Sequence, residues 1–183
     1  MDGDLTSRTF TSRDFREALG LFGTGVVIAT TRSASGERLG ATISSFNSVS
    51  LDPPLILFSI ARSAKAFAAW ETTKAFAVSI LSEEQTELST RFAKPMADKW
   101  RDVTPHDSRA GVPLLPGALV WIECSAYAKY DGGDHLILVG EVETLRVTRR
   151  TGRPLLFFGG KYRRLEAEPI DTPSDAGFWL HGW

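Results

Sequence analysis

The residue types best suited to binding chemistry gather in one segment, Gly40–Lys65 (GATISSFNSVSLDPPLILFSIARSAK). It holds three small residues, three hydroxyls and a basic end: Gly40, Ala41 and Thr42, then Ser44, Ser45 and Ser48, then Lys65. The small side chains would let a flat ring lie close to the backbone, and the hydroxyls offer donors and acceptors. A lysine after a strand and turn can meet a phosphate. The segment therefore fits a planar ring with a phosphate tail, although a serine-rich connection beside a buried strand has the same composition.

Three other places carry candidate groups. His135 follows the Gly132-Gly133-Asp134 turn, where its imidazole either faces a pocket mouth or bonds Asp134. Phe157, Phe158, Gly159 and Gly160 end a strand, so they can either stack on a nicotinamide or adenine ring or form a core aromatic pair and a turn. Arg91, beside Phe92 at a predicted helix end, either reaches a phosphate or complements the helix C-terminus.

Several common chemistries lack their sequence motifs. No His, Cys, Asp and Glu spacing fits a metal site, so none is expected. No GxSxG is present, and neither GxGxxG nor GxxxxGK[ST] occurs, which excludes the usual serine-hydrolase, dinucleotide-fold and P-loop interpretations. Cys124, the one cysteine, lies in a predicted strand and fits a buried, inert thiol.

Composition favours an ordinary globular protein. The chain has 183 residues, 43% hydrophobic and 23% charged, with a net charge of -1. This balance argues against nucleic-acid and membrane partners. The start of the chain lacks the basic and apolar regions of a signal peptide, and a single cysteine suits a reducing compartment. These features predict a cytoplasmic protein.

The hydrophobic pattern predicts about seven strands with three short helices. Helices are expected at about 13–21, at 63–71 and from Ser82 to about Phe92, and strands at 26–31, 39–44, 55–61, 75–81, 118–130, 135–147 and 154–158. Asp131-Gly132-Gly133-Asp134 is a strong hairpin turn between the two long strands. Because the strands follow one another through turns, an antiparallel barrel is favoured over a doubly wound sheet.

Two segments have no clear period. Residues 94–116 contain four prolines, and this loop could be a lid over the site or a wrapped surface segment. Residues 166–183 form a tail whose Phe178, Trp179 and Trp183 suggest docking on a partner. We expect one domain at 12–165, followed by this tail.

Five stretches in order resemble the flavin reductase family with an FMN-binding split barrel, the small reductase components of two-component flavin-dependent monooxygenases. They are Phe22–Val26, Gly40–Ser50 with Asp52-Pro53-Pro54, Arg91-Phe92-Ala93, Gly133-Asp134-His135 with Gly140-Glu141-Val142, and Pro154–Gly160. The resemblance covers most of residues 12–165. It implies a mainly β, Greek-key split β-barrel with a few short helices, assembled as a homodimer with flavin near the subunit interface.

The resemblance also implies roles for individual residues. The flavin contacts would be Gly40, Ala41, Thr42, Ser44, Ser45, Ser59, Ile60, Ala61, Lys65, Ala66, Arg91 and Phe92. The nicotinamide contacts would be His135, Phe157, Phe158, Gly159 and Gly160. Family members often carry a polar residue where this chain has Gly159. His135 would orient the nicotinamide while hydride passes to the flavin, and reduced flavin would go to a flavin-dependent monooxygenase.

The activity implied is that of an NAD(P)H-dependent flavin reductase. FMN or FAD is the flavin, and NADH is favoured over NADPH because no arginine cluster for a 2′-phosphate stands out. Two alternatives stay open: a split barrel whose bound flavin serves a dedicated acceptor, and a flavin- or heme-binding module without turnover. The sequence decides neither the tightness of flavin binding nor the identity of the oxygenase and its substrate.

Overall fold

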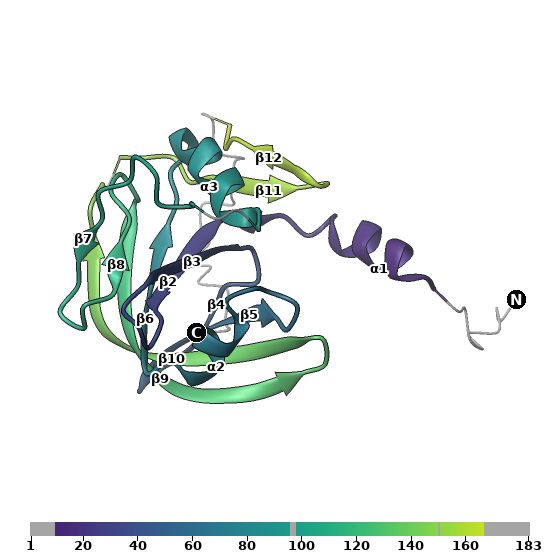
Figure 1. Cartoon of the computed structure of the whole chain (residues 1–183). Coiled ribbons are helices and arrows are strands. Elements are labelled where there is room, and N and C mark those ends of the chain that lie inside the picture. Colours follow the sequence, from purple (N-terminus) through teal and green to yellow (C-terminus); the bar gives the residue numbers. More distant parts are fainter. Residues whose placement is uncertain (1–9, 96–97, 150, 167–183) are drawn as a thin grey trace, which may run out of the picture.

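Seven antiparallel strands form the main sheet, which curls into a barrel in this computed structural model (Figure 1). The structure describes residues 10–95, 98–149 and 151–166. The strand order is β3-β2-β6-β9-β10-β5-β4. The bounds are β2 (Val27–Arg32), β3 (Arg38–Ile43), β4 (Asn47–Leu51), β5 (Pro54–Ala61), β6 (Ala75–Ile80), β9 (Val120–Gly132) and β10 (His135–Val147). The mainly β split barrel predicted from the sequence is confirmed.

The remaining strands form two small sheets. The first has the order β1-β11-β12, with β1 (Thr24–Gly25), β11 (Leu156–Phe158) and β12 (Lys161–Arg163). The second pairs β7 (His106–Asp107) with β8 (Pro113–Leu114). The helices are α1 (Ser12–Leu19), α2 (Phe67–Thr72) and α3 (Thr86–Ala93), and a 3₁₀ turn at Glu83–Gln85 leads into α3.

The long hairpin of β9 and β10 forms the central part of the barrel. Its register pairs His135 with Gly132, so the turn itself is Gly133-Asp134. Gly133 has φ 73°, a conformation that glycine adopts without strain. β10 also pairs with β5, in a register that sets His135 opposite Ala61. The hairpin therefore brings His135 to the end of the strand that begins the Ser59–Lys65 region.

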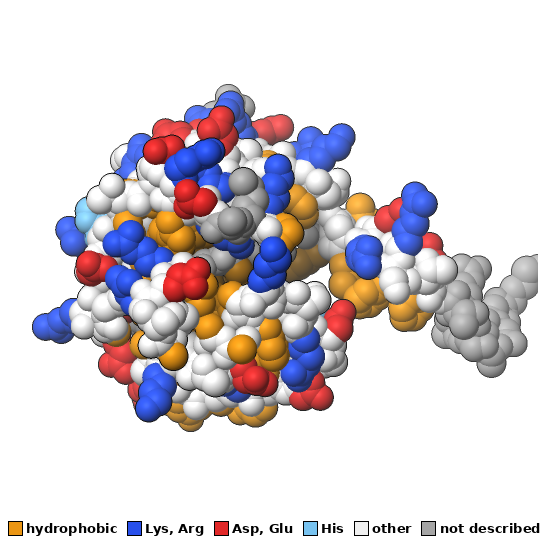
Figure 2. All heavy atoms as spheres, viewed as in Figure 1, with side chains coloured by type: hydrophobic (Ala, Val, Ile, Leu, Met, Phe, Trp, Pro, Cys, Tyr) orange, Lys and Arg blue, Asp and Glu red, His pale blue; other side chains and the backbone are white. Residues whose placement is uncertain are grey.

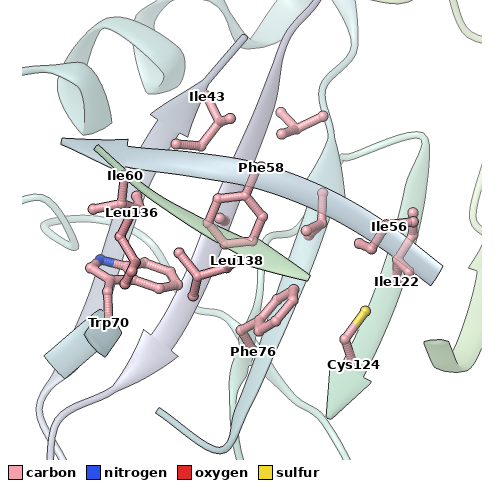
Figure 3. Packing of buried hydrophobic residues seen from close by; sticks show 13 residues of the cluster. Ile43, Ile56, Phe58, Ile60, Trp70, Phe76, Ile122, Cys124, Leu136 and Leu138 are labelled. Carbon is pink, nitrogen blue, oxygen red and sulfur yellow. The ribbon is translucent and has the colours of Figure 1, made fainter. Parts of the chain in front are cut away.

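Large aromatic side chains fill the centre of the barrel (Figure 3). The Phe58 ring contacts both Trp70 and Phe76 edge-on, with ring centroids 5.7 and 5.1 Å apart. All three side chains are buried, and Trp70 comes from α2 rather than from a strand. Burial of such side chains supplies most of the stabilisation of a β-barrel this size. α2 is therefore fixed against the barrel by its tryptophan.

Several predicted elements differ in detail. The first helix begins at Ser12 with the expected Thr11–Asp14 capping box but ends at Leu19, and none of its residues is buried. α2 starts only at Phe67, where no side chain caps the helix. β4 was not predicted as a strand, because its sequence NSVSL is polar and its pairing with β5 is interrupted between Ser48 and Ser50. The capping box at Ser82 and Gln85 is present as predicted.

Residues 98–116, which we call the strap, contain β7 and β8 and are bound to the barrel along much of their length. Thr30 Oγ1 donates to the Pro113 carbonyl, and the Leu115 amide donates to Ser79 Oγ. Val112, Leu114 and Leu115 are buried. These contacts all involve the second half of the strap, and for that half the alternative of a wrapped surface segment holds. The predicted tail lies almost wholly outside the described residues.

Among the described residues, no helix combines the length and the apolar character that crossing a bilayer requires.

Candidate functional site

A cavity of about 820 Å³ opens between β3 and α2, beside the ends of β5 and α3. The predicted flavin contacts come together here. Those that line the cavity are Gly40, Ala41, Thr42, Ser44, Ser45, Ser59, Ile60, Ala61, Lys65, Ala66 and Phe92. These residues come from β3, β5 and α3 and from the segments after β3 and before α2, so the fold assembles them rather than local chain geometry. The volume lies in the upper part of the range of about 300–1,000 Å³ for small-molecule sites.

Arg91 is the predicted flavin contact that lies elsewhere. Its side chain is directed to the strap, where Nη1 donates to the Arg101 carbonyl at 2.6 Å. The residue is absent from the cavity lining. In this structure Arg91 therefore holds the strap near the end of α3, and its assignment to a phosphate stays a prediction without support from its placement.

The small size of Gly40 has a different reason from the one the sequence suggested. A Cβ at Gly40 would lie 2.5 Å from the Phe92 ring, so the missing side chain makes room for a buried phenylalanine of α3. Thr42 also faces α3, because its Oγ1 donates to the Ser89 carbonyl at 2.6 Å. Contacts with α3 therefore account for both residue types.

Two serines join the strands at one end of the cavity. Ser45 Oγ accepts from the Ser59 amide at 3.0 Å and lies 3.5 Å from the Ser59 carbonyl oxygen. This contact links the chain just after β3 to β5. The cavity lining continues from this contact along β3 to Arg38.

The strap supplies two lining residues that the sequence did not single out, Lys99 and Trp100. Lys99 Nζ donates to the carbonyls of Gly40 at 3.1 Å and Phe92 at 2.7 Å. Burial lowers the pKa of this ammonium group. Trp100 Nε1 donates to the Arg38 carbonyl at 2.8 Å, and its ring meets Phe92 edge-on at 5.0 Å. The first half of the strap thus forms a wall of the cavity.

The charges around the cavity are unbalanced. The charged lining residues are the basic Arg38, Lys65, Lys94 and Lys99 and the acidic Glu37. No ion pair among the described residues involves any of them. The whole chain has a net charge of -1, so this positive excess is local. Such a cavity favours an anionic ligand.

His135 lies at the Ser45–Ser59 end of the cavity and bonds Asp134. Its Nδ1 is 2.7 Å from Asp134 Oδ1, and this hydrogen bond lowers the pKa of the Asp134 carboxyl. Both sequence interpretations of His135 therefore hold together, because the ring lines the cavity while Asp134 engages one nitrogen. The other nitrogen, Nε2, is left for a ligand.

Arg62 fixes the turn that carries His135, and sequence reasoning missed it. Its Nε donates to the Gly133 carbonyl at 2.9 Å, and Nη2 donates to Asp131 Oδ1 at 2.8 Å. Its backbone amide also donates to the Asp134 carbonyl. A single residue after β5 thereby holds the end of β9 and both residues of the turn. Its position three residues before Lys65 was the only available signal.

The other predicted nicotinamide contacts do not meet His135 within one chain. Phe157 packs against Tyr162 with ring centroids 5.6 Å apart, and Phe158 is 40% exposed. Gly159 and Gly160 form a turn with positive φ, and the Gly159 amide donates to the Gly20 carbonyl. None of the four lines the cavity.

Cys124 takes no part in the cavity and sits in the barrel core (Figure 3). Burial raises the pKa of its thiol to about 12, and Glu143 and Glu123 add to the effect. At pH 8 the thiolate fraction is then about a thousandfold below that of a free cysteine. We expect a thiol reagent to leave the native chain unmodified at pH 8 and to label it in denaturant, as mass spectrometry can record. Stoichiometric labelling of the native chain would contradict this placement.

Side chains that bind metals do not cluster in the part of the chain that the structure describes. No group of three or more histidine, cysteine, aspartate and glutamate side chains there is arranged to hold an ion.

Comparisons with known proteins all identify flavin reductases or reductase subunits. The model of a family described as "Flavin reductase like domain" matches residues 19–166. The protein named FMN reductase (NADH) SmoA from Agrobacterium fabrum is 43% identical over 157 residues, which are 86% of this chain and 88% of that protein. The flavin-dependent monooxygenase reductase subunit HsaB of Rhodococcus jostii is 38% identical over 91% of this chain and 85% of its own length.

A solved structure resembles the fold over nearly the whole chain. The nitrilotriacetate monooxygenase component B from Mycobacterium thermoresistibile superposes with a TM-score of 0.81 at 38% identity, covering 92% of this chain and 96% of that one. The residues that the family model matches, 19–166, include every residue that lines the cavity.

Proposed function

The chain belongs to the flavin reductase-like domain family, and from this premise we propose that it is an NAD(P)H:flavin oxidoreductase that supplies reduced flavin to a partner monooxygenase. The observation that carries the proposal is the cavity itself, because eleven of the twelve flavin contacts that the resemblance implied line one basic cavity. Relatives named as an NADH-dependent FMN reductase and as a monooxygenase reductase subunit support it.

The donor set fits a flavin. The cavity offers the small residues Gly40 and Ala41 on β3, hydroxyls at Ser44 and Ser45, and a lysine at its rim, Lys65. A flavin bound here would accept a hydride from NAD(P)H together with a proton, leaving NAD(P)⁺. The chain's own task is positioning. Lys65 would hold a phosphate, and Asp134 would orient the His135 ring so that Nε2 could bond the nicotinamide.

The direct test follows NADH oxidation at 340 nm with the purified chain. We expect loss of NADH only when FMN or FAD is added, because no other acceptor is supplied. A preference between the two flavins, and between NADH and NADPH, comes from the same assay. Binding of flavin without NADH oxidation would contradict the reductase and favour a binding module. Turnover that rises strongly only with a separate acceptor would favour a dedicated-acceptor enzyme.

We propose the finer classification as an NADH-dependent reductase of the EC 1.5.1 type. The relative whose name includes NADH supports this choice. A reducing compartment such as the cytoplasm suits the single buried cysteine, Cys124. The functional unit is residues 12–165.

We also propose that the chain works as a homodimer. α1 extends away from the barrel (Figure 1), and hydrophobic side chains gather along one side of it (Figure 2). The exposed set is Phe10, Phe15, Leu19, Leu21 and Phe22, each at least 50% exposed. A row of this size on a free surface favours an interface. Exposed Phe158 lies next to it, since its ring would be 3.8 Å from a Cβ at Gly23.

The dimer can be tested by light scattering. We expect the native chain to have twice the monomer mass and a Phe15→Asp/Leu19→Asp variant to be monomeric. Because neither side chain is buried in the single chain, the variant should keep its circular dichroism spectrum. A native monomer at micromolar concentration would overturn the proposal.

A further inference from the structure

We propose that Arg62 is a positioning residue for the reaction with NADH: it holds the β9–β10 turn so that the His135 ring keeps one orientation in the cavity. The inference rests on the proposed function and deepens it. Arg62 is absent from the cavity lining, whereas His135 belongs to it. Arg62 would therefore act through the turn and not by touching a substrate.

The turn that carries His135 is not held by packing. It consists of Gly133 and Asp134, and Gly133 has φ 73°. The Asp134 side chain, which engages Nδ1 of the ring, is 93% exposed, and the His135 side chain is 43% exposed. The position of this carboxylate therefore follows from its own backbone, and a change in the turn would move the ring.

Arg62 fixes that backbone at three points. Its amide donates to the Asp134 carbonyl at 2.9 Å, directly beyond the paired ends of β5 and β10. Nε donates to the Gly133 carbonyl at 2.9 Å, and Nη2 donates to Asp131 Oδ1 at 2.8 Å. The same Asp131 oxygen accepts from the Gly133 amide at 3.1 Å. One guanidinium group thus joins the end of β9 to the turn.

The guanidinium group also connects the turn to α2. Arg62 Cζ lies over the Phe67 ring, 5.5 Å from its centroid. Phe67 begins α2 and packs against the barrel core, and the next three residues of that helix, 68–70, line the cavity. A cation over an aromatic face is attracted to it. Arg62 therefore holds the turn at a fixed place relative to one wall of the cavity.

These contacts should matter more for the reaction than for stability. The Arg62 side chain is 40% exposed, and ion pairs at such sites add little to the stability of a fold. A small displacement of a group that orients a substrate, in contrast, costs a large factor in rate. We expect Arg62→Gln to lower kcat/KM for NADH by about five- to twentyfold, with flavin affinity unchanged.

A double-mutant cycle with His135→Ala tests whether Arg62 acts through His135. In the His135→Ala background there is no ring to orient, so Arg62→Gln should cause no further loss of kcat/KM. A direct contact between Arg62 and NADH would instead multiply the two losses. Arg62→Lys should restore part of the rate, because its ammonium group keeps the charge beside Asp131 but lacks the fork that reaches two acceptors.

Arg32 offers a matched control. Its Nε donates to the carbonyl of a glycine, Gly111, and its Nη2 donates to Asp107 Oδ1 at 3.0 Å. The Arg32 side chain is 32% exposed, close to the value for Arg62, and it lies outside the cavity lining. We expect Arg32→Gln to keep the native kcat/KM for NADH and the native flavin affinity.

A second readout needs neither NADH nor flavin. In the chain alone at alkaline pH, Nδ1 of His135 carries the proton that Asp134 accepts, so the two ring nitrogens should have well separated ¹⁵N shifts in NMR spectra. In Arg62→Gln the two tautomers should mix, and the shifts should approach each other. Arg32→Gln should leave them unchanged. The signals are assigned by their loss in His135→Ala.

The inference is overturned if Arg62→Gln keeps the native kcat/KM, or if its loss is the same with and without the His135 ring. Unchanged ring shifts in Arg62→Gln also overturn it. If circular dichroism shows that Arg62→Gln does not fold, Asp131→Asn decides by the same criteria, with a smaller expected loss.

Failure of the proposed function has a different signature. A native chain that does not oxidise NADH in the presence of flavin overturns the reductase, whereas the ring shifts still decide whether Arg62 orients His135. The two failures are therefore distinguishable.

Discussion

Replacing Phe92 by alanine is expected to lower the free energy of unfolding by about 3–5 kcal/mol, and replacing Gly40 by alanine by about 1–3 kcal/mol. Phe92 is 1% exposed and belongs to the core formed by β2, α3 and the strap. A Cβ at Gly40 would lie 2.5 Å from Phe92 Cε1 and 2.7 Å from Cδ1. Such distances force the ring or the strand to shift. Urea unfolding followed by circular dichroism measures both values.

Combining the two substitutions in one variant tests the contact between Gly40 and Phe92 directly. In a Phe92→Ala background, the ring that opposes a Cβ at position 40 is gone. The Gly40→Ala cost should therefore fall to near zero, so the double variant is more stable than additivity predicts. Gly25→Ala is the control, because a Cβ there meets nothing within 4 Å. Strict additivity would show that the strain at Gly40 has another source.

This pair also illustrates what the sequence could predict. Gly40 was singled out as a place where a ring meets the backbone, and it does line the cavity. Its lack of a side chain, however, is required by a phenylalanine 52 positions later. The type of residue was informative, whereas the reason for it depended on a contact between distant elements. Sequence patterns carry local information and report such packing only indirectly.

The elements that local rules govern were predicted well. The β9–β10 hairpin has its glycines at the turn, and the turn falls where Gly132-Gly133 indicated. The strap is the opposite case. Lys99 reaches a carbonyl 59 positions away at Gly40, and Trp100 reaches one 62 positions away at Arg38. No periodicity marks a lysine that donates to the backbone of another strand, so its place in the cavity wall required the fold.

The separation of His135 from Phe157–Gly160 has a similar origin. β11 pairs with β1 and β12 in a small sheet of its own rather than with the barrel strands. Order along the chain made these residues look like one nicotinamide site with His135. In a homodimer of the kind proposed, exposed groups near α1 such as Phe158 would lie at the contact between copies. Their contact with the nicotinamide stays a prediction, and it depends on the proposed dimer.

Replacing His135 by alanine is expected to lower kcat/KM for NADH by about 10- to 100-fold and to leave flavin affinity unchanged. The ring lines the cavity at the end of β5, and Asp134 engages its Nδ1 at 2.7 Å. That bond lowers the pKa of the Asp134 carboxyl, and the ionised carboxylate keeps the ring oriented. Initial rates at several NADH concentrations, with flavin binding measured separately, test this prediction.

Asp134→Asn tests whether orientation is what matters. The amide can still bond Nδ1 but holds the ring less firmly than a carboxylate, so we expect a smaller loss in the same direction as for His135→Ala. His106→Ala is the matched control, since His106 is an exposed histidine that packs on Trp121 of β9, away from the cavity. Both the rate and the flavin affinity should be native in that control. If His135→Ala weakens flavin binding instead of the reaction with NADH, His135 belongs to the flavin side of the cavity, and the nicotinamide must approach from β3 and α2.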